Sequence, residues 1–226
     1  MNILSTGLDE GEGSATQRAY VVLRRMIVEG DLKPGEKLKI EGLRRRLDIG
    51  ASPIREALSL LTSDNLVERL DQRGFRAAPI SAENFEEILA LRCTLEDMAL
   101  RQTIEVADDA WEEGLVLAHH RMRRAKGAEP GVFELLHKAF HMALLANTRS
   151  PILYKFCSQL YDLNIRYRFL AGNAMNYRAR NVGDEHQGIL DAAVARDADT
   201  ASARLISHYR RTGEFVVELI GSGGLR

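Results

Sequence analysis

The sequence predicts a mainly α-helical protein in two parts. The first is a winged helix-turn-helix of three helices and a β-hairpin, and the second is an antiparallel bundle of about six helices. Apolar residues recur at helical spacing over most of the chain. The spacing changes to the alternation of strands only at residues 66–80, where LVERL, DQRG and FRAAPI predict a hairpin. No strand pattern follows Pro79.

Capping and turn residues bound the first two helices. Ser14 followed by Gln17 is a capping-box pattern, which predicts a helix running to Glu29. Pro34-Gly35 predicts a turn after it. A short helix is then expected over residues 40–47.

The third helix follows the tight turn DIGAS. Ser52 is the expected N-cap and Pro53 the expected first helical residue. Ile54 and Leu58 lie on its apolar face. With the hairpin behind it, this order of elements is that of a winged helix-turn-helix, whose second motif helix enters the DNA major groove.

The rest of the chain has helical patterns throughout. Ser81 caps the first of these helices, and Ser150-Pro151 opens the fourth. The predicted ranges are 82–105, 108–126, 131–147, 151–170, 174–196 and 198–220. The predicted organisation is a disordered tail at 1–13, a DNA-binding domain at 14–79 and a helical domain at 80–226.

Charge is distributed unevenly although the net charge is only −1. Residues 15–79 hold 13 Lys and Arg against 9 Asp and Glu, whereas residues 80–226 hold 18 against 20. A basic part joined to a mildly acidic part is typical of a binding module attached to another domain.

Nothing in the sequence predicts secretion or membrane insertion. No apolar run has the length of a membrane span, and the N-terminus lacks the pattern of a secretory signal. Cys93 and Cys157 have no metal-like spacing. A cytoplasmic, nucleoid-associated protein with reduced thiols is therefore expected.

Six residues form the predicted DNA-binding set. Arg55, in the first turns of the third helix, can bind guanine through two hydrogen bonds or can bind phosphate. The alternative for each arginine alone is solvated surface charge, but their placement on this architecture favours DNA. The set comprises Arg44, Arg45, Ser52, Arg55, Arg73 and Gly74.

Four histidines form a candidate metal site. His137 and His141 are four residues apart and share one helix face. His186 and His208 lie on the two following helices, and helical bundles build metal sites from such facing side chains. The alternative is four unrelated histidines, each buried and hydrogen-bonded. His119-His120 adjoins a basic helix end and is expected at the surface.

Arg92 lies at the edge of the apolar stripe of its helix and therefore needs an anionic partner. Glu96, one turn later, is one candidate. Tyr161 and Phe156 are expected in the core.

Two stretches carry a family resemblance. GASPIREAL and LVERLDQRGFRAAPIS resemble the recognition helix and wing of GntR-type transcription regulators, and the helical part resembles the FCD effector domain of the FadR subfamily. The resemblance covers about residues 15–220 and is nearest to carbon-starvation-type regulators, which share the AFH segment and the RYRF run at 166–169. It implies a homodimer that binds double-stranded operator DNA and responds to a small organic (di)carboxylate effector.

The same resemblance implies a metal site. His141, His186 and His208 match the three family histidines, and His137 stands where the family has aspartate. His137 is either a fourth ligand, which favours zinc or nickel over calcium or magnesium, or it lies outside the coordination sphere. Arg92 would grip the effector carboxylate. Arg166 and Tyr167, with Arg168, would line the pocket.

Two departures concern DNA. Gly50-Ala51 replaces the usual Ser-Arg, and Glu41 replaces the usual arginine at the start of the second helix. Base readout would therefore shift to the remaining arginines, or the operator differs from the usual family sequence.

Two other functions remain open at this point. In a metal sensor, the ion itself would be the signal. In a metal-dependent hydrolase, a general base is needed beside the ion, and Glu185, next to His186, is the candidate. Two observations oppose it: neighbours on a helix point about 100° apart, and the chain has no His-Glu-x-x-His motif.

Overall fold

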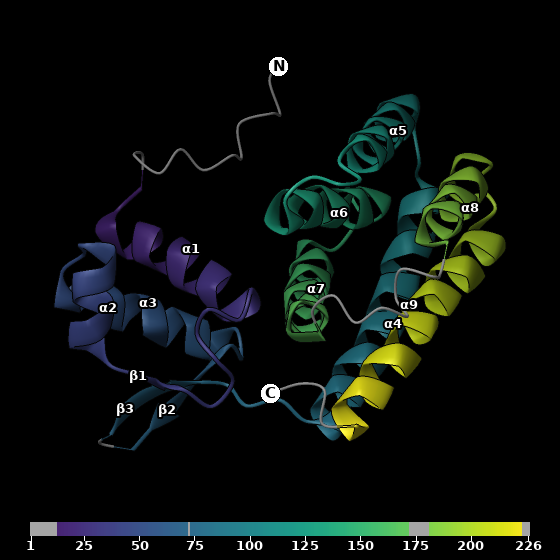
Figure 1. The fold of residues 1–226 in the computed structure, drawn as a ribbon. Helices are drawn as coiled ribbons and strands as arrows, with labels where there is room; N and C mark the ends of the chain where they lie inside the picture. Colours follow the sequence, from purple (N-terminus) through teal and green to yellow (C-terminus); the bar gives the residue numbers. More distant parts are fainter. Residues whose placement is uncertain (1–12, 72, 172–180, 223–226) are drawn as a thin grey trace. The chain divides into compact units, whose positions relative to one another are not determined.

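The computed structural model describes residues 13–71, 73–171 and 181–222 (Figure 1). Most of the predicted tail at 1–13 lies outside these residues. The backbone forms two compact units, Met1–Ile80 and Ser81–Arg226, and each is described by itself. Within the described residues, no helix is both long and apolar enough to cross a membrane.

The first unit combines helices with a small sheet, as predicted. Its described elements are α1 (Ala15–Val28), β1 (Lys37–Leu38), α2 (Ile40–Leu47), α3 (Ala51–Ser63), β2 (Val67–Leu70) and β3 (Gly74–Ala77). The strands are antiparallel in the order β1-β3-β2, with Leu38 opposite Phe75. The wing thus has a third strand that the sequence did not predict, because two residues are too few to show an alternating pattern.

The start of α3 differs from the prediction. Gly50, with φ −60° and ψ 156°, is the N-cap, and the helix begins at Ala51. The predicted cap at Ser52 is wrong, and its hydroxyl donates instead to Glu56 Oε1 at 3.2 Å. Pro53 is tolerated at the third position because the first N–H groups of a helix have no intrahelical partner. The first turn of α3 therefore has no side-chain cap.

The core of the first unit lies between α1 and α3. Five of its side chains are fully buried, namely Leu23, Ile27, Ile54, Leu58 and Leu61. Ser14 caps α1 as predicted, since its hydroxyl accepts from the Gln17 amide at 3.1 Å. Tyr20 ties α1 to the end of α3 through a 2.6 Å hydrogen bond from its hydroxyl to Asp64. These contacts hold α3 in place.

The wing turn depends on Gly74, whose φ is +94°. We expect Gly74→Ala to destabilise the protein by about 1–2 kcal/mol, because an L-residue in this region brings Cβ too close to the backbone. Gly114 is the matched control. It lies inside helix α5 (Asp109–Arg124), where an added Cβ would meet nothing within 4 Å, so Gly114→Ala should stabilise the protein by about 0.5–1 kcal/mol. Urea unfolding of both variants measures the contrast, and equal effects would contradict it.

The described part of the second unit is helical throughout. Its helices are α4 (Ala82–Glu105), α5 (Asp109–Arg124), α6 (Pro130–Leu144), α7 (Pro151–Ala171), α8 (Val182–Val194) and α9 (Ala198–Gly221). Ser81 caps α4 and Ser150 caps α7, as predicted. The predicted start at 174 of the fifth helix lies outside the described residues, and α8 begins at Val182.

Two long helices, α4 and α9, run side by side through this unit (Figure 1). Helix α7 packs against α4, α8 packs against α9 and α5, and α5 packs against α6. Two expectations are corrected. His119 is buried at 3% exposure, because its ring packs on Phe140 with centroids 5.2 Å apart. Phe156 is 52% exposed and lies outside the core.

Candidate metal centre and DNA-binding surface

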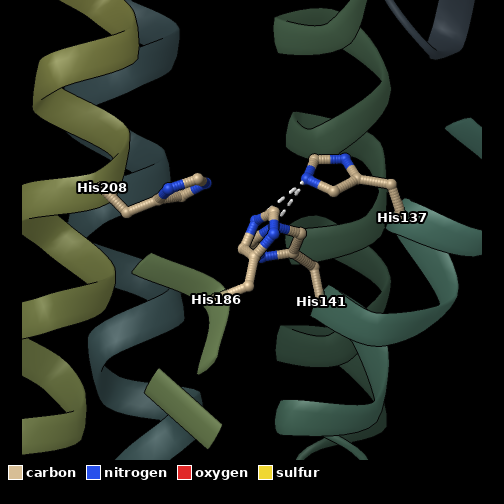
Figure 2. Close-up of side chains that lie close together, drawn as sticks. All are labelled: His137, His141, His186 and His208. Atoms are coloured by element: carbon tan, nitrogen blue, oxygen red, sulfur yellow. Dashed lines mark hydrogen bonds between the residues drawn. The ribbon is translucent and has the colours of Figure 1, made fainter. Parts of the chain in front are cut away.

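Four histidines converge inside the second unit (Figure 2). His137 and His141 come from α6, His186 from the first turns of α8, and His208 from the middle of α9. Each is at most 4% exposed. One ring nitrogen from each lies within 4.8 Å of the other three. The structure therefore brings together all four histidines that the sequence singled out.

Three of these nitrogens meet closely. Nε2 of His137 lies 3.2 Å from Nε2 of His186 and 3.1 Å from Nε2 of His141. Each Nε2 carries either one proton or one in-plane lone pair. Nε2 of His137 can therefore satisfy only one of its two neighbours through a hydrogen bond, whereas a cation between them satisfies all three.

Burial keeps three of the four histidines neutral. It lowers the pKa of His137 and of His186, and it lowers the pKa of His141 well below the usual value. The neighbouring imidazoles and Arg92 add to this effect at His141. Neutral imidazole is the form that ligates metals.

Polar groups surround the histidines on their outer side. Nδ1 of His137 contacts the Tyr161 hydroxyl at 2.6 Å, Glu134 Oε1 at 3.1 Å and Arg168 Nη1 at 3.3 Å. Burial by itself raises the pKa of Glu134, but the charge of Arg168, together with the hydrogen bonds from His137 and Tyr161, outweighs it and lowers the pKa to about 2. Glu134 is therefore a carboxylate.

His208 and His141 also have polar contacts on their outer side, which come from residues of α8 and α9. Nδ1 of His208 lies 2.8 Å from Glu185 Oε2, and Nδ1 of His141 lies 2.9 Å from the Tyr209 hydroxyl. The Tyr209 hydroxyl in turn donates to Glu96. Both histidines are therefore connected by hydrogen bonds to a carboxylate, His208 directly and His141 through Tyr209.

Arg92 lies beside the cluster and is 4% exposed. Its Nε donates to Glu96 at 2.5 Å and its Nη1 to Asn164 at 2.9 Å. Burial alone lowers the pKa of Arg92, but the charge of Glu96 reverses the shift and raises it. The guanidinium lies between two rings, 4.6 Å from the centroid of Tyr161 and 4.0 Å from that of Tyr209. Among the described residues, its Nη2 is buried without a hydrogen-bond partner.

The side chains of the RYRF run on α7 contact two different parts of the second unit, the start of α4 and the histidine cluster. The Tyr167 hydroxyl accepts from the Ser81 amide at 3.3 Å and donates to Asn84 at 2.8 Å, which places it at the start of α4. Arg168 contacts His137 and forms an ion pair with Glu134 at 3.6 Å. Arg166 is buried, and this burial lowers its pKa to about 10.

Sequence reasoning did not predict the hydrogen bonds that four polar residues make to the histidines: Glu134, Tyr161, Glu185 and Tyr209. A signal existed for Glu134, which is one turn before His137 and so shares its helix face. Glu185 was considered only as a base beside His186, whereas it bonds to His208. No sequence spacing relates Tyr209 to His141, 68 residues away.

The predicted DNA-binding residues lie at the surface of the first unit. All six are exposed: Arg44, Arg45, Ser52, Arg55, Arg73 and Gly74. Arg44 and Arg45 line a hollow at the turn between α2 and α3, together with Asp48, Ile49 and Gly50. The uncapped first turn of α3 opens beside it. Arginines and free N–H groups at a helix N-terminus both suit phosphate.

Comparison with known proteins identifies the two units. Residues 15–76 match the family of bacterial regulatory proteins called gntR, and residues 87–211 match the FCD domain. The transcriptional regulator BphR of Paraburkholderia xenovorans is 38% identical over 86% of this chain and 82% of its own length. The transcriptional repressor GlaR of Escherichia coli is 31% identical over 84% and 90%.

A solved structure shares the fold. E. coli McbR/YncC superposes with a TM-score of 0.79 over 91% of this chain and 98% of its own, at 21% identity. The curated relatives are transcription regulators, which rules out the hydrolase considered from the sequence. The chain therefore belongs to the GntR family, carries an FCD domain, and is a DNA-binding transcription regulator rather than an enzyme.

Proposed function

We propose that this regulator binds a divalent transition metal, zinc or nickel, at its four histidines, and that a small (di)carboxylate bound there changes its affinity for operator DNA. The observation that carries this proposal is the buried cluster whose ring nitrogens lie within 4.8 Å of one another. A bound ion would supply positive charge and an open coordination position to an effector carboxylate.

The donor set fits such an ion. Four imidazole nitrogens suit zinc and nickel, whereas calcium and magnesium prefer oxygen. Nitrogens about 2.0–2.1 Å from one zinc ion lie about 3.3 Å apart in a tetrahedron. The Nε2 separations of 3.1 and 3.2 Å around His137 are close to that value. In this proposal His137 is a ligand.

Arg92 and Arg166, with Tyr167, are the proposed effector-binding residues. Arg92 supports this most strongly, because its Nη2 is buried without a partner among the described residues. Arg168, at 3.3 Å from His137, offers a second cation next to the cluster. Two cations beside a dication favour a ligand with more than one negative charge. The AFH and RYRF segments at 139–141 and 166–169 support a relationship to carbon-starvation-type regulators.

Operator binding is proposed to use a homodimer and the exposed residues of the first unit. Paired half-sites on DNA require paired recognition helices. The proposed contacts are Arg55 and Ser52 on α3, Arg44 and Arg45 on α2, and Arg73 and Gly74 on the wing.

Arg55→Ala tests the recognition helix. We expect it to weaken specific operator binding by about 1–3 kcal/mol if the guanidinium reads a base. The variant should also lose discrimination between operator and unrelated DNA, measured by fluorescence anisotropy at fixed salt. A uniform loss on both DNAs would assign Arg55 to a phosphate instead.

Titration of operator affinity tests the effector proposal. Metal-free protein is titrated first with zinc or nickel and then, with metal bound, with a series of mono- and dicarboxylates. The proposal expects an acid to change the affinity only when metal is present. If metal alone switches the affinity and no acid adds to it, the protein is a metal sensor and the carboxylate proposal fails.

A further inference from the structure

The contact between His208 and Glu185 fixes which ring nitrogen carries a proton. Glu185 Oε2 lies 2.8 Å from Nδ1 of His208, and a carboxylate can only accept a hydrogen bond. Nδ1 therefore bears the hydrogen, and Nε2 keeps its lone pair. This is the tautomer that presents Nε2 to a metal.

The same reasoning applies at His137. The Glu134 carboxylate forms an ion pair with Arg168, and the Tyr161 hydroxyl donates its one proton to Glu134. Nδ1 of His137 lies 3.1 Å from Glu134 and 2.6 Å from the Tyr161 oxygen. Both oxygens are left to accept from Nδ1–H. Arg168 Nη1, at 3.3 Å, would require the opposite tautomer, but Arg168 also has an anionic partner in Glu134.

At His141 a tyrosine lies between the ring and the carboxylate. The Tyr209 hydroxyl donates to Glu96, so its oxygen accepts from Nδ1 of His141 at 2.9 Å. Glu96 is held in turn by Arg92. Arg92 is therefore linked to His141 through two hydrogen-bonded side chains.

We propose that Glu134, Glu185 and Glu96 are positioning residues, which hold three histidines in the Nδ1–H tautomer so that their Nε2 lone pairs face one point. This inference rests on the proposed metal site. It also assigns a role to His137, which stands where the family has aspartate: its imidazole would be the ligand in place of that carboxylate. The carboxylate stands one turn earlier, at Glu134, and acts through the imidazole.

The tautomer assignment has a further physical consequence. With Nδ1–H on both His137 and His141, two lone pairs face each other at 3.1 Å without a proton between them. That arrangement is repulsive by itself and becomes favourable around a cation. Carboxylates behind ligating histidines also increase the basicity of the ligand, and their loss typically weakens metal binding by about 10–100-fold.

Zinc affinity of the full-length protein tests the proposal. Wild type, Glu134→Gln and Glu185→Gln are each titrated against a chromophoric chelator of known affinity. We expect about 10–100-fold weaker zinc binding in both variants. Asp162→Asn is the matched control: its carboxylate bonds to Lys138 between the same helices and is 13% exposed, against 12% for Glu134. Its affinity should change by less than about threefold, well below the range for a positioning carboxylate.

The outcomes separate the two proposals. If wild type binds neither zinc nor nickel in such titrations, the proposed metal site fails. If wild type binds zinc and both glutamine variants bind equally well, the metal site stands and the positioning role fails. If Asp162→Asn loses as much affinity as they do, the effect is general electrostatics and the positioning role also fails. Glu185 is 17% exposed at the start of α8, so its variant is testable even if Glu134→Gln misfolds.

Nitrogen-15 NMR of the histidine rings checks the tautomers without metal. In metal-free wild type we expect Nδ1–H on His137, His141 and His208, and a mixture of tautomers at His208 in Glu185→Gln, because an amide can either donate or accept. Nε2–H on His137 or His208 in wild type would overturn the assignment.

Discussion

Protein carrying His141→Ala should be purified without stoichiometric metal. His141 is 1% exposed and offers its Nε2 3.1 Å from that of His137, so its removal deletes a ligand from the centre of the cluster. The remaining three nitrogens come from separate helices, and among the described His, Cys, Asp and Glu side chains the group has no fifth member. His208→Ala should have the same result, because it removes the one histidine of the group that lies on α9.

Metal content by inductively coupled plasma mass spectrometry measures this loss. His120→Ala is the matched control, since His120 is exposed on α5 and its loss removes an imidazole from the protein surface. Normal metal content in His141→Ala would disprove the site. His137→Ala then decides the role of His137: a large loss of affinity makes it a ligand, and a small loss places it outside the coordination sphere.

Arg92→Met should destabilise the metal-free protein by about 3–5 kcal/mol. The substitution leaves Glu96, which is 2% exposed, as a buried carboxylate without its cation. It also removes the guanidinium from between the rings of Tyr161 and Tyr209. Unfolding in guanidinium chloride, with a chelator present, measures the change in the free energy of unfolding without the stabilisation that a bound metal adds.

A double variant isolates the buried charge as the cause. Arg92→Met combined with Glu96→Leu removes both charges, so it should recover much of the stability lost in Arg92→Met. No recovery would mean that packing around Arg92, rather than the uncompensated carboxylate, determines the loss. Thr94→Ala on the same helix, at an exposed position, should change stability by no more than about 0.5 kcal/mol.

The sequence predicted long helices with a regular apolar period. It did not predict which of several neighbouring residues caps a helix, or which of two neighbouring side chains is buried. The range 82–105 of α4 was predicted to the residue, because Ser81 provides a cap and the apolar period continues for six turns. At α3, Gly50, Ser52 and Pro53 are all acceptable near a helix start, and the backbone of Gly50 decided where it begins. His119 was misplaced because the residues that follow it are rich in basic side chains, whereas its burial depends on the packing of its ring on Phe140 of another helix.

The part of the site that depends on residues sharing a helix face was predictable from the sequence. Spacing placed His137 and His141 together, and a bundle brings His186 and His208 to the same interior. The outer contacts were not predictable in the same way. Tyr209 donates to Glu96, 113 residues away, and that pairing depends on the register between α4 and α9, which no local pattern encodes.

Helix α7 has a mechanical consequence that follows from two adjacent residues. Tyr167 holds the backbone of Ser81, the residue at which the second unit begins, while Arg168 touches His137. Neighbours on a helix are 1.5 Å apart along its axis and rotate together about it. A rotation of α7 about its axis that moves Arg168 would therefore also move the Tyr167 hydroxyl, which accepts a hydrogen bond from the Ser81 amide. In the proposed mechanism, a ligand that binds at the histidine cluster and moves Arg168 would therefore also act, through α7, on Ser81, the first residue of the second unit.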